Sequence, residues 1–284
     1  MTDIDFVIPF GSLPERFSES IKHPPETPAT PRAAATIVLL RDAPGGMEVL
    51  LMRRNRNAGF VPGAYVFPGG RVDGTDAAPD LMRRLDGLSP ESAAERLALK
   101  NGEPPAIAYY LAALREAFEE TGILVGRRSD GSSPPTAAED PMVDSIRDDV
   151  MEGKTSFTQA ISLLQCRIEG HAIEYLAHWI TPEPEPRRYD TRFFAVKVYP
   201  GAEPIVDARE MSDAVWITPT GALERLDEGD LPMVFPTIKT LEQLAPYDTA
   251  DAALTAIGRA PVRTIMPTLI ITPTGVGLQL EDED

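Results

Sequence analysis

The sequence contains a single cysteine, Cys166, and only three histidines among its 284 residues. One cysteine cannot close a disulfide within the chain, which is typical of a protein in a reducing cytoplasm. His23, His171 and His178 have no HxxxH spacing and no cysteine partner, which argues against a zinc site. The sequence also lacks GxSxG and a glycine-rich strand-to-helix turn, which excludes serine hydrolases and dinucleotide-binding enzymes.

Basic residues are few, with 27 Lys and Arg against 44 Asp and Glu, and the net charge is −17. Such a surface repels phosphodiester backbones, so we expect no nucleic acid partner. A small anionic substrate is still compatible with this charge, because a bound metal ion inverts the local field. The N-terminus is acidic and unlike a secretory signal, and no run is long and apolar enough to span a bilayer. We therefore expect a cytoplasmic protein with no membrane partner.

The order of sequence patterns predicts an α/β fold. Proline-rich residues 1–32 predict an extended N-terminal arm, and residues 33–284 a single domain with an insertion at 71–105 and a C-terminal extension at about 230–284. Two aliphatic runs around a glycine-rich turn predict a β-hairpin, 34–40 and 47–53. Further strands are expected near 172–180, 191–199, 213–218 and 269–280, and helices over 106–121, 142–168 (one or two), 219–228 and 237–245. Mixed strands with helices between them predict an α/β/α sandwich.

The clearest element is the helix expected over residues 106–121 and ended by Gly122. On a helical wheel its apolar side chains gather on one face and three acids on the opposite face. The apolar stripe consists of Ile107, Tyr110, Leu111, Leu114 and Phe118, and the acids are Glu116, Glu119 and Glu120.

This acidic cluster is locally unfavourable. Carboxylates spaced i, i+3 and i+4 repel one another, and the C-terminal end of a helix disfavours anions. A bound Mg²⁺ would reverse this balance, because it takes oxygen ligands from carboxylates and phosphates. Arg115 is placed to pair with Glu119 four residues later. The alternative is a solvated acidic helix face, which a lone pair of glutamates would favour.

Residues 115–122, REAFEETG, resemble the second half of the Nudix box. That pattern is G, five residues, E, seven residues, then R-E-hydrophobic-x-E-E-x-G-hydrophobic, and residues 67–70, FPGG, resemble its opening. The resemblance implies a Nudix-type α/β/α sandwich and a diphosphatase that depends on Mg²⁺ (or Mn²⁺). It also implies that Glu116, Glu119, Glu120 and the carbonyl of Gly69 hold the metal, while Arg115 orients the acids.

The sequence departs from the pattern because the residues at 71–105 interrupt the box. The first box glutamate should lie eight residues before Arg115, where this chain has Ile107 on the apolar face, and Glu103 is a candidate substitute. The interrupted box resembles that of the peroxisomal coenzyme A diphosphatases and their bacterial relatives. For that subgroup the implied substrate is coenzyme A or acyl-CoA, split to 3′,5′-ADP and 4′-phosphopantetheine species.

Several further residues are candidates for the site. Glu210, six residues before Trp216, lies where Nudix enzymes often add an acid, so it is either a metal ligand or general base, or an exposed loop carboxylate. The arginines around residue 190 either contact phosphate or ribose, or form a salt-bridge network between elements. The predicted substrate contacts are Arg54, Phe67, Arg187, Arg188 and Arg192.

Two other functions stay open at this point. The first is a different diphosphatase specificity, for ADP-ribose, NADH or a dinucleoside polyphosphate. The second is a catalytically silent Nudix module that senses a nucleotide, which the missing first glutamate favours. For every one of these functions the expected partner is a small nucleotide diphosphate, and a homodimer is compatible with the sequence.

Overall fold

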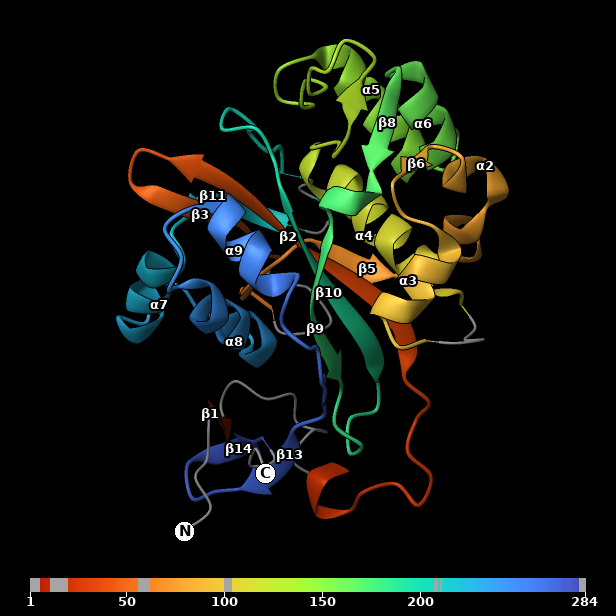
Figure 1. The fold of residues 1–284 in the computed structure, drawn as a ribbon. Coiled ribbons are helices and arrows are strands. Elements are labelled where there is room, and N and C mark those ends of the chain that lie inside the picture. Colours follow the sequence, from red (N-terminus) through yellow and green to blue (C-terminus); the bar gives the residue numbers. More distant parts are fainter. Residues whose placement is uncertain are drawn as a thin grey trace.

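The computed structural model describes residues 6–10, 20–55, 62–99, 104–206, 209 and 211–280. Within these residues a central eight-stranded sheet has helices on both faces (Figure 1), which confirms the predicted α/β/α sandwich. Six strands follow the order β11-β3-β2-β10-β9-β12, while β4 pairs with β3 and β5 with β2. Their bounds are β2 Arg32–Ala43, β3 Gly46–Arg54, β4 Tyr65–Val66, β5 Gly69–Arg71, β9 Glu174–Ile180, β10 Tyr189–Lys197, β11 Met211–Ile217 and β12 Thr264–Ile265.

Strand β2 lies near the centre of the sheet and determines where the glycine pair of β5 sits. The hairpin β2–β3 is antiparallel, as predicted, and β10 runs parallel to β2, which makes the sheet mixed. Beyond that hairpin, β5 pairs with the first half of β2, so that Gly69 lies opposite Thr36 and Gly70 opposite Ala35. After β3 and β4 the chain therefore returns to the middle of the sheet.

Helix α4, Ala106–Thr121, packs on one face of this sheet, with the bounds expected from the sequence. Its apolar stripe contributes to a large core that also includes Phe194 of β10, whose ring lies 4.3 Å from that of Tyr110. Fourteen of its sixteen residues are buried, so even the acidic side of the helix is mostly covered. Neither this helix nor any other in the described ranges is long and apolar enough to cross a membrane.

The opposite face of the sheet is covered by three helices (Figure 1), α7 Pro219–Asp227, α8 Phe235–Leu244 and α9 Ala250–Ile257. The first two match helices expected from the sequence, within two residues at each end. Helix α9 was not predicted. Its N-cap is Thr249, whose hydroxyl accepts a hydrogen bond from the backbone N–H of Ala252, a capping pattern that the prediction overlooked.

The two segments around α4 form a side layer (Figure 1). The first contains η2 Gly74–Ala77, α2 Pro79–Met82, β6 Leu85–Asp86 and α3 Pro90–Arg96, and the second contains β7 Arg127–Arg128, α5 Pro141–Met151, α6 Phe157–Leu163 and β8 Cys166–Glu169. A small sheet of order β6-β8-β7 joins the two segments. The region 142–168 is thus two helices followed by a strand, and Cys166 is a buried strand residue rather than a helical one.

The terminal segments differ from the prediction. Residues 269–280 were expected to form one strand, but they form the hairpin β13 Thr268–Ile271 and β14 Gly275–Gln279. Phe6–Pro9 of the expected arm is strand β1, which pairs antiparallel with β14. The Phe6 ring stacks on Phe235 of α8, so this part of the arm is joined to the domain. The division into an arm and a single domain of residues 33–284 stays a prediction.

The β1–β14 pairing predicts that Gly275→Ala releases the N-terminal strand. A methyl group at Gly275 would overlap the backbone carbonyl of Ile8, which cannot move without breaking the pairing. We expect faster amide exchange over residues 6–10, measured by hydrogen–deuterium exchange. The control is Gly45→Ala, where nothing lies within 4 Å of the added methyl group. Equal exchange rates in the two variants would contradict the pairing.

Candidate active site

The glycine pair of β5 lies directly under the last turns of α4. The carboxylate of Glu116 rests against Gly70, where a methyl group would overlap it. The backbone N–H of Gly69 donates to Oε2 of Glu120 at 3.1 Å. A methyl group at Gly69 would come within 2.5 Å of the carbonyl oxygen of Ala35. At Gly69 glycine is required by the backbone of the neighbouring strand β2, whereas at Gly70 a methyl group would displace the carboxylate of Glu116.

The side chain of Arg115 is at the centre of the acidic cluster. Its Nη1 donates to Oε1 of Glu116 at 2.9 Å and to Oε2 of Glu119 at 3.1 Å, which is the i, i+4 pair expected from the sequence. Its Nε and Nη2 donate to the two carboxylate oxygens of Asp76, at 2.8 and 3.1 Å. A further bond runs from Nη2 to the carbonyl of Arg71 at 2.9 Å. Arg115 is only 8% exposed, and these bonds fix its orientation.

Asp76 corrects the prediction about the first acid of the box. Counting back from Arg115 led to Ile107, which is buried in the apolar core. Counting forward from Gly70 by the spacing of the box, five residues and then an acid, leads to Asp76. The insertion comes after this acid, and η2 returns it to Arg115, where it is 1% exposed. The suggested substitute Glu103 lies outside the described residues.

Burial shifts the titration of the two acids that share Arg115. It raises the pKa of Glu116 to about 7, with repulsion from Glu119 adding to the effect and attraction by Arg115 opposing it. Burial also raises the pKa of Glu119 above its ordinary range, again opposed by Arg115. One guanidinium faces three carboxylates at this point, those of Asp76, Glu116 and Glu119. The cluster therefore holds more negative charge than its arginine balances.

Comparison with known proteins assigns the family. The family model described as the NUDT19 Nudix domain matches residues 31–244. The chain belongs to this Nudix family. It is 30% identical over 207 residues to "Acyl-coenzyme A diphosphatase NUDT19" of Xenopus laevis, a match that covers 62% of this chain and 54% of the frog protein. The protein of the same name from Homo sapiens is 27% identical over 279 residues, or 84% of this chain and 74% of the human protein.

A solved structure supports the Nudix fold directly. The crystal structure of a Nudix hydrolase from Alicyclobacillus acidocaldarius is 29% identical and superposes with a TM-score of 0.67. The superposition covers 82% of this chain and 99% of that one. By contrast, the present chain spans only about half of the frog relative, so part of that relative has no counterpart in the match.

The Nudix acids fit a hard divalent cation chemically. Within the described residues no group of three His, Cys, Asp or Glu side chains is arranged to coordinate a metal ion. The carboxylates of Glu116 and Glu120 instead accept hydrogen bonds from Arg115 and from the backbone of Gly69. All the donors are oxygens, which suit Mg²⁺ or Mn²⁺ rather than zinc. The excess negative charge of the cluster and the raised pKa of Glu116 are both conditions that a bound cation would relieve.

Arg54 is the last residue of β3, and Phe67 follows β4, which pairs with β3. Glu210 is outside the described residues, and its neighbour Met211 pairs with Arg54 across β11 and β3. Arg54 is partly buried at this strand end. Phe67 is 4% exposed and belongs to the core on the α7–α9 face. That burial favours a packing role for Phe67 over the predicted contact with substrate.

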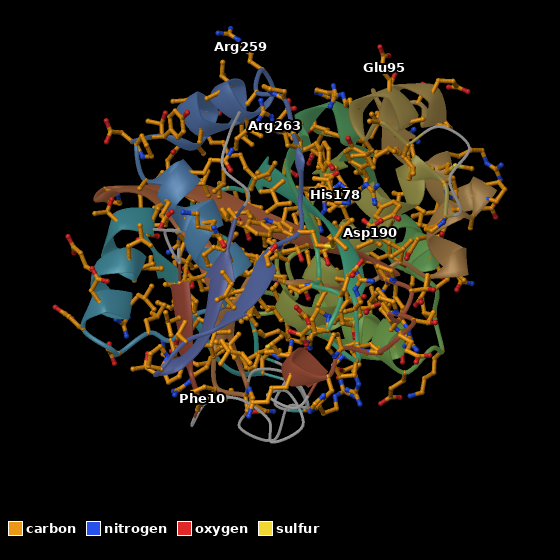
Figure 2. All side chains as sticks on the ribbon, turned by 90° about the horizontal axis from the view of Figure 1, so that it is seen from below. Phe10, Glu95, His178, Asp190, Arg259 and Arg263 are labelled. Carbon is orange, nitrogen blue, oxygen red and sulfur yellow. The ribbon has the colours of Figure 1, made fainter. Side chains whose placement is uncertain are left out.

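The arginines around residue 190 are held differently from one another. Arg192 is 4% exposed, donates to Oδ1 of Asp190 at 2.8 Å and stacks over Tyr109 at 4.3 Å. His178 contacts the same Asp190 oxygen at 2.6 Å, and Figure 2 shows these two side chains next to each other. For Arg192 this geometry favours the internal network over substrate binding.

Arg188 and Arg187 complete this group. Arg188 is 7% exposed and donates to the carbonyls of Thr181 and Ala29, so it ties the β9–β10 turn to the N-terminal segment. Arg187 is exposed, and its role in substrate binding stays a prediction. Sequence reasoning therefore missed two features of the site. One is Asp76 as a partner of Arg115, and the other is the contact between Gly70 and the carboxylate of Glu116.

The buried pair predicts a large effect of Asp76→Asn on stability. Removing the charge leaves a bidentate arginine without its main partner, so we expect the free energy of unfolding to fall by about 3 kcal/mol. Denaturant unfolding measures this change. Asp73→Asn is the matched control, because Asp73 is 56% exposed and 4.0 Å from Arg115. Similar stability of the two variants would show that the pair with Asp76 is unimportant.

The close approach of helix and strand predicts that Gly70→Ala abolishes hydrolysis. The added methyl group displaces the carboxylate of Glu116 from its seat, whereas Gly74→Ala, with nothing within 4 Å, leaves it in place. Steady-state rates of both variants on the same substrate test this difference. An active Gly70→Ala enzyme would mean that Glu116 works from another position.

Proposed function

We propose that the chain is a metal-dependent diphosphatase that hydrolyses coenzyme A or acyl-CoA to 3′,5′-ADP and 4′-phosphopantetheine species. The observation that supports the chemistry is the arrangement of Glu116, Glu119 and Glu120 at the end of α4, called the acid turn below. Arg115 bonds the carboxylates of Glu116 and Glu119, and the backbone of Gly69 bonds the carboxylate of Glu120. The substrate is supported by relatives from frog and man that bear the name acyl-coenzyme A diphosphatase. It is supported further by the match of residues 31–244 to the family model described as the NUDT19 Nudix domain.

In this proposal Glu116, Glu119, Glu120 and the carbonyl of Gly69 hold Mg²⁺ (or Mn²⁺). Such an ion, when bound, lowers the pKa of a coordinated water and neutralises charge on the phosphoryl oxygens. Arg115 keeps the carboxylates of Glu116 and Glu119 in place, since one guanidinium nitrogen bonds both.

The proton of the attacking water goes to a carboxylate, either Glu116 or Glu210. Glu116 projects from the acid turn itself, beside Gly70. Glu210 directly precedes β11 in the sequence, and that strand pairs with β3 at Arg54. Arg54 and the exposed Arg187 are the proposed contacts for the substrate's phosphate groups.

The remaining assignments are also proposals. The net charge of −17 supports a small-molecule partner and speaks against nucleic acid. A cytoplasmic location is supported by the single cysteine. A homodimer is compatible with the three-stranded sheet β1-β14-β13, because a second chain can pair along one of its edge strands, β1 or β13.

The test is a substrate panel with a matched pair of variants. Coenzyme A, an acyl-CoA, ADP-ribose, NADH and a dinucleoside polyphosphate are each incubated with Mg²⁺ or with EDTA, and products are identified by mass spectrometry. We expect 3′,5′-ADP from the two coenzyme A substrates, only with Mg²⁺. Glu119→Gln should lower this rate at least about a hundredfold, because metal ligands contribute more than the residues that orient them. Glu95→Gln, at an exposed position (Figure 2), should leave it unchanged.

Other outcomes have definite meanings. Cleavage of ADP-ribose, NADH or the dinucleoside polyphosphate alone would keep the chemistry and refute the coenzyme A assignment. Stabilisation of the protein by these ligands without any product would identify a nucleotide-sensing module instead. Equal rates with EDTA and with Mg²⁺ would contradict the role given to the acid turn.

A further inference from the structure

The carbonyl of Glu119, near the end of α4, receives no hydrogen bond from the described backbone that follows the helix. The helix ends at Gly122, whose φ is +69° and whose N–H bonds the carbonyl of Phe118 at 2.9 Å. In the Schellman ending the N–H of that glycine bonds the carbonyl three residues before it, here Glu119, and in a continuing helix the N–H of Ile123 would bond that carbonyl. The N–H of Ile123 instead bonds the hydroxyl of Thr121 at 3.1 Å. The chain that follows α4 therefore leaves the carbonyl of Glu119 open to another donor.

Arg147 supplies that donor from α5. Its Nε donates to the carbonyl oxygen of Glu119 at 2.6 Å, across 28 residues of sequence. Arg147 is 3% exposed, so the bond is shielded from water. Its Nη1 lies 3.6 Å from Asp144 and 3.9 Å from Asp148, which hold the guanidinium from its own helix.

The same arginine is linked to the loop before β11. Asp148 lies 3.8 Å from Arg209, the residue directly before Glu210. The backbone N–H of Ile205, earlier in this loop, donates to the carbonyl of Thr121 at 2.9 Å. Helix α5 thus contacts both the acid turn of α4 and the segment that leads to the second candidate acid.

The position of Arg147 also suits the charges of the turn. Three glutamates project from the C-terminal end of a helix, where the helix dipole is negative and disfavours them. A guanidinium bonded to a carbonyl of that same turn offsets both the dipole and the carboxylates. Arg115 holds the carboxylate of Glu119, and Arg147 holds its backbone.

We propose that Arg147 is a positioning residue for metal binding, which fixes the backbone from which Glu119 and Glu120 project. The proposal rests on the proposed function, because it assumes that these acids hold the cation. A site of this kind needs its ligands held to within about half an ångström, and a buried bond to the peptide of one ligand provides that. Loss of such a supporting contact typically weakens metal binding by about 10- to 100-fold.

The first measurement is Mn²⁺ binding without substrate, read from the electron paramagnetic resonance signal of the free ion. Arg147→Met keeps the length of the side chain but removes the donor, and we expect its Mn²⁺ dissociation constant to rise about 10- to 100-fold. Arg127→Met is the matched control. It removes a 53% exposed arginine of the same side layer, which pairs with Glu169. Wild-type affinity in Arg147→Met would overturn the proposal and leave the proposed function standing.

The second measurement is hydrogen–deuterium exchange over residues 115–123 in metal-free protein. We expect faster exchange there in Arg147→Met, because the last turn of α4 loses its anchor, and no change in Arg127→Met. Unchanged exchange would overturn the proposal even if Mn²⁺ bound less tightly. If the wild-type protein binds no Mn²⁺, the proposed function and the positioning role both fail, whatever the exchange rates.

Thermal unfolding shows whether Arg147→Met folds. If it does not, Arg147→Lys is the variant that tests the proposal. A lysine can donate to the carbonyl of Glu119 but cannot at the same time reach Asp148 with a planar fork. We therefore expect weaker Mn²⁺ binding than in the wild type, and tighter binding than in any folded Arg147→Met. A folded Arg147→Lys with faster exchange than the wild type over residues 115–123 but with unchanged Mn²⁺ affinity would overturn the proposal when the methionine variant cannot be measured.

Discussion

The ion pairs of one buried guanidinium, that of Arg115, hold the site together. Three acids at the end of a helix repel one another and oppose the helix dipole, so the turn would not keep this arrangement unaided. Arg115 bonds two of these acids through one nitrogen and Asp76 through two others. Because Asp76 comes from η2, just before the insertion, and Arg115 from α4, the same contact also fixes how the two parts of the divided box meet.

The central sheet and the side layer also position the acid turn. The pairing of β5 with β2 places Gly69 and Gly70 beneath the acid turn, and the missing side chain of Gly70 leaves room for the carboxylate of Glu116. On the other side, α5 reaches the end of α4 through Arg147. A motif that the insertion divides in the sequence is therefore reassembled in space from β5, η2 and α4, with support from an element outside the motif.

The sequence was sufficient where signals are local. The bounds of α4 follow from its apolar stripe and from Gly122, and the hairpin β2–β3 follows from two aliphatic runs around a glycine-rich turn. Signals that span the insertion were harder to read: counting back from Arg115 missed Asp76, although counting forward from Gly70 finds it. Arg147 could not be identified at all, since nothing local separates it from the other basic residues. Its role depends on where α5 lies relative to α4, which tertiary packing decides.

The central claim is that the acid turn gathered by Arg115 is a metal site, and a crystal of the protein grown with Mn²⁺ tests it most directly. Anomalous scattering locates the ion without reference to the protein coordinates. The account predicts a peak among the carboxylates of Glu116, Glu119 and Glu120, next to the carbonyl of Gly69. At saturating Mn²⁺, a well-ordered acid turn with no peak beside it, or a peak only elsewhere on the acidic surface, would contradict the account.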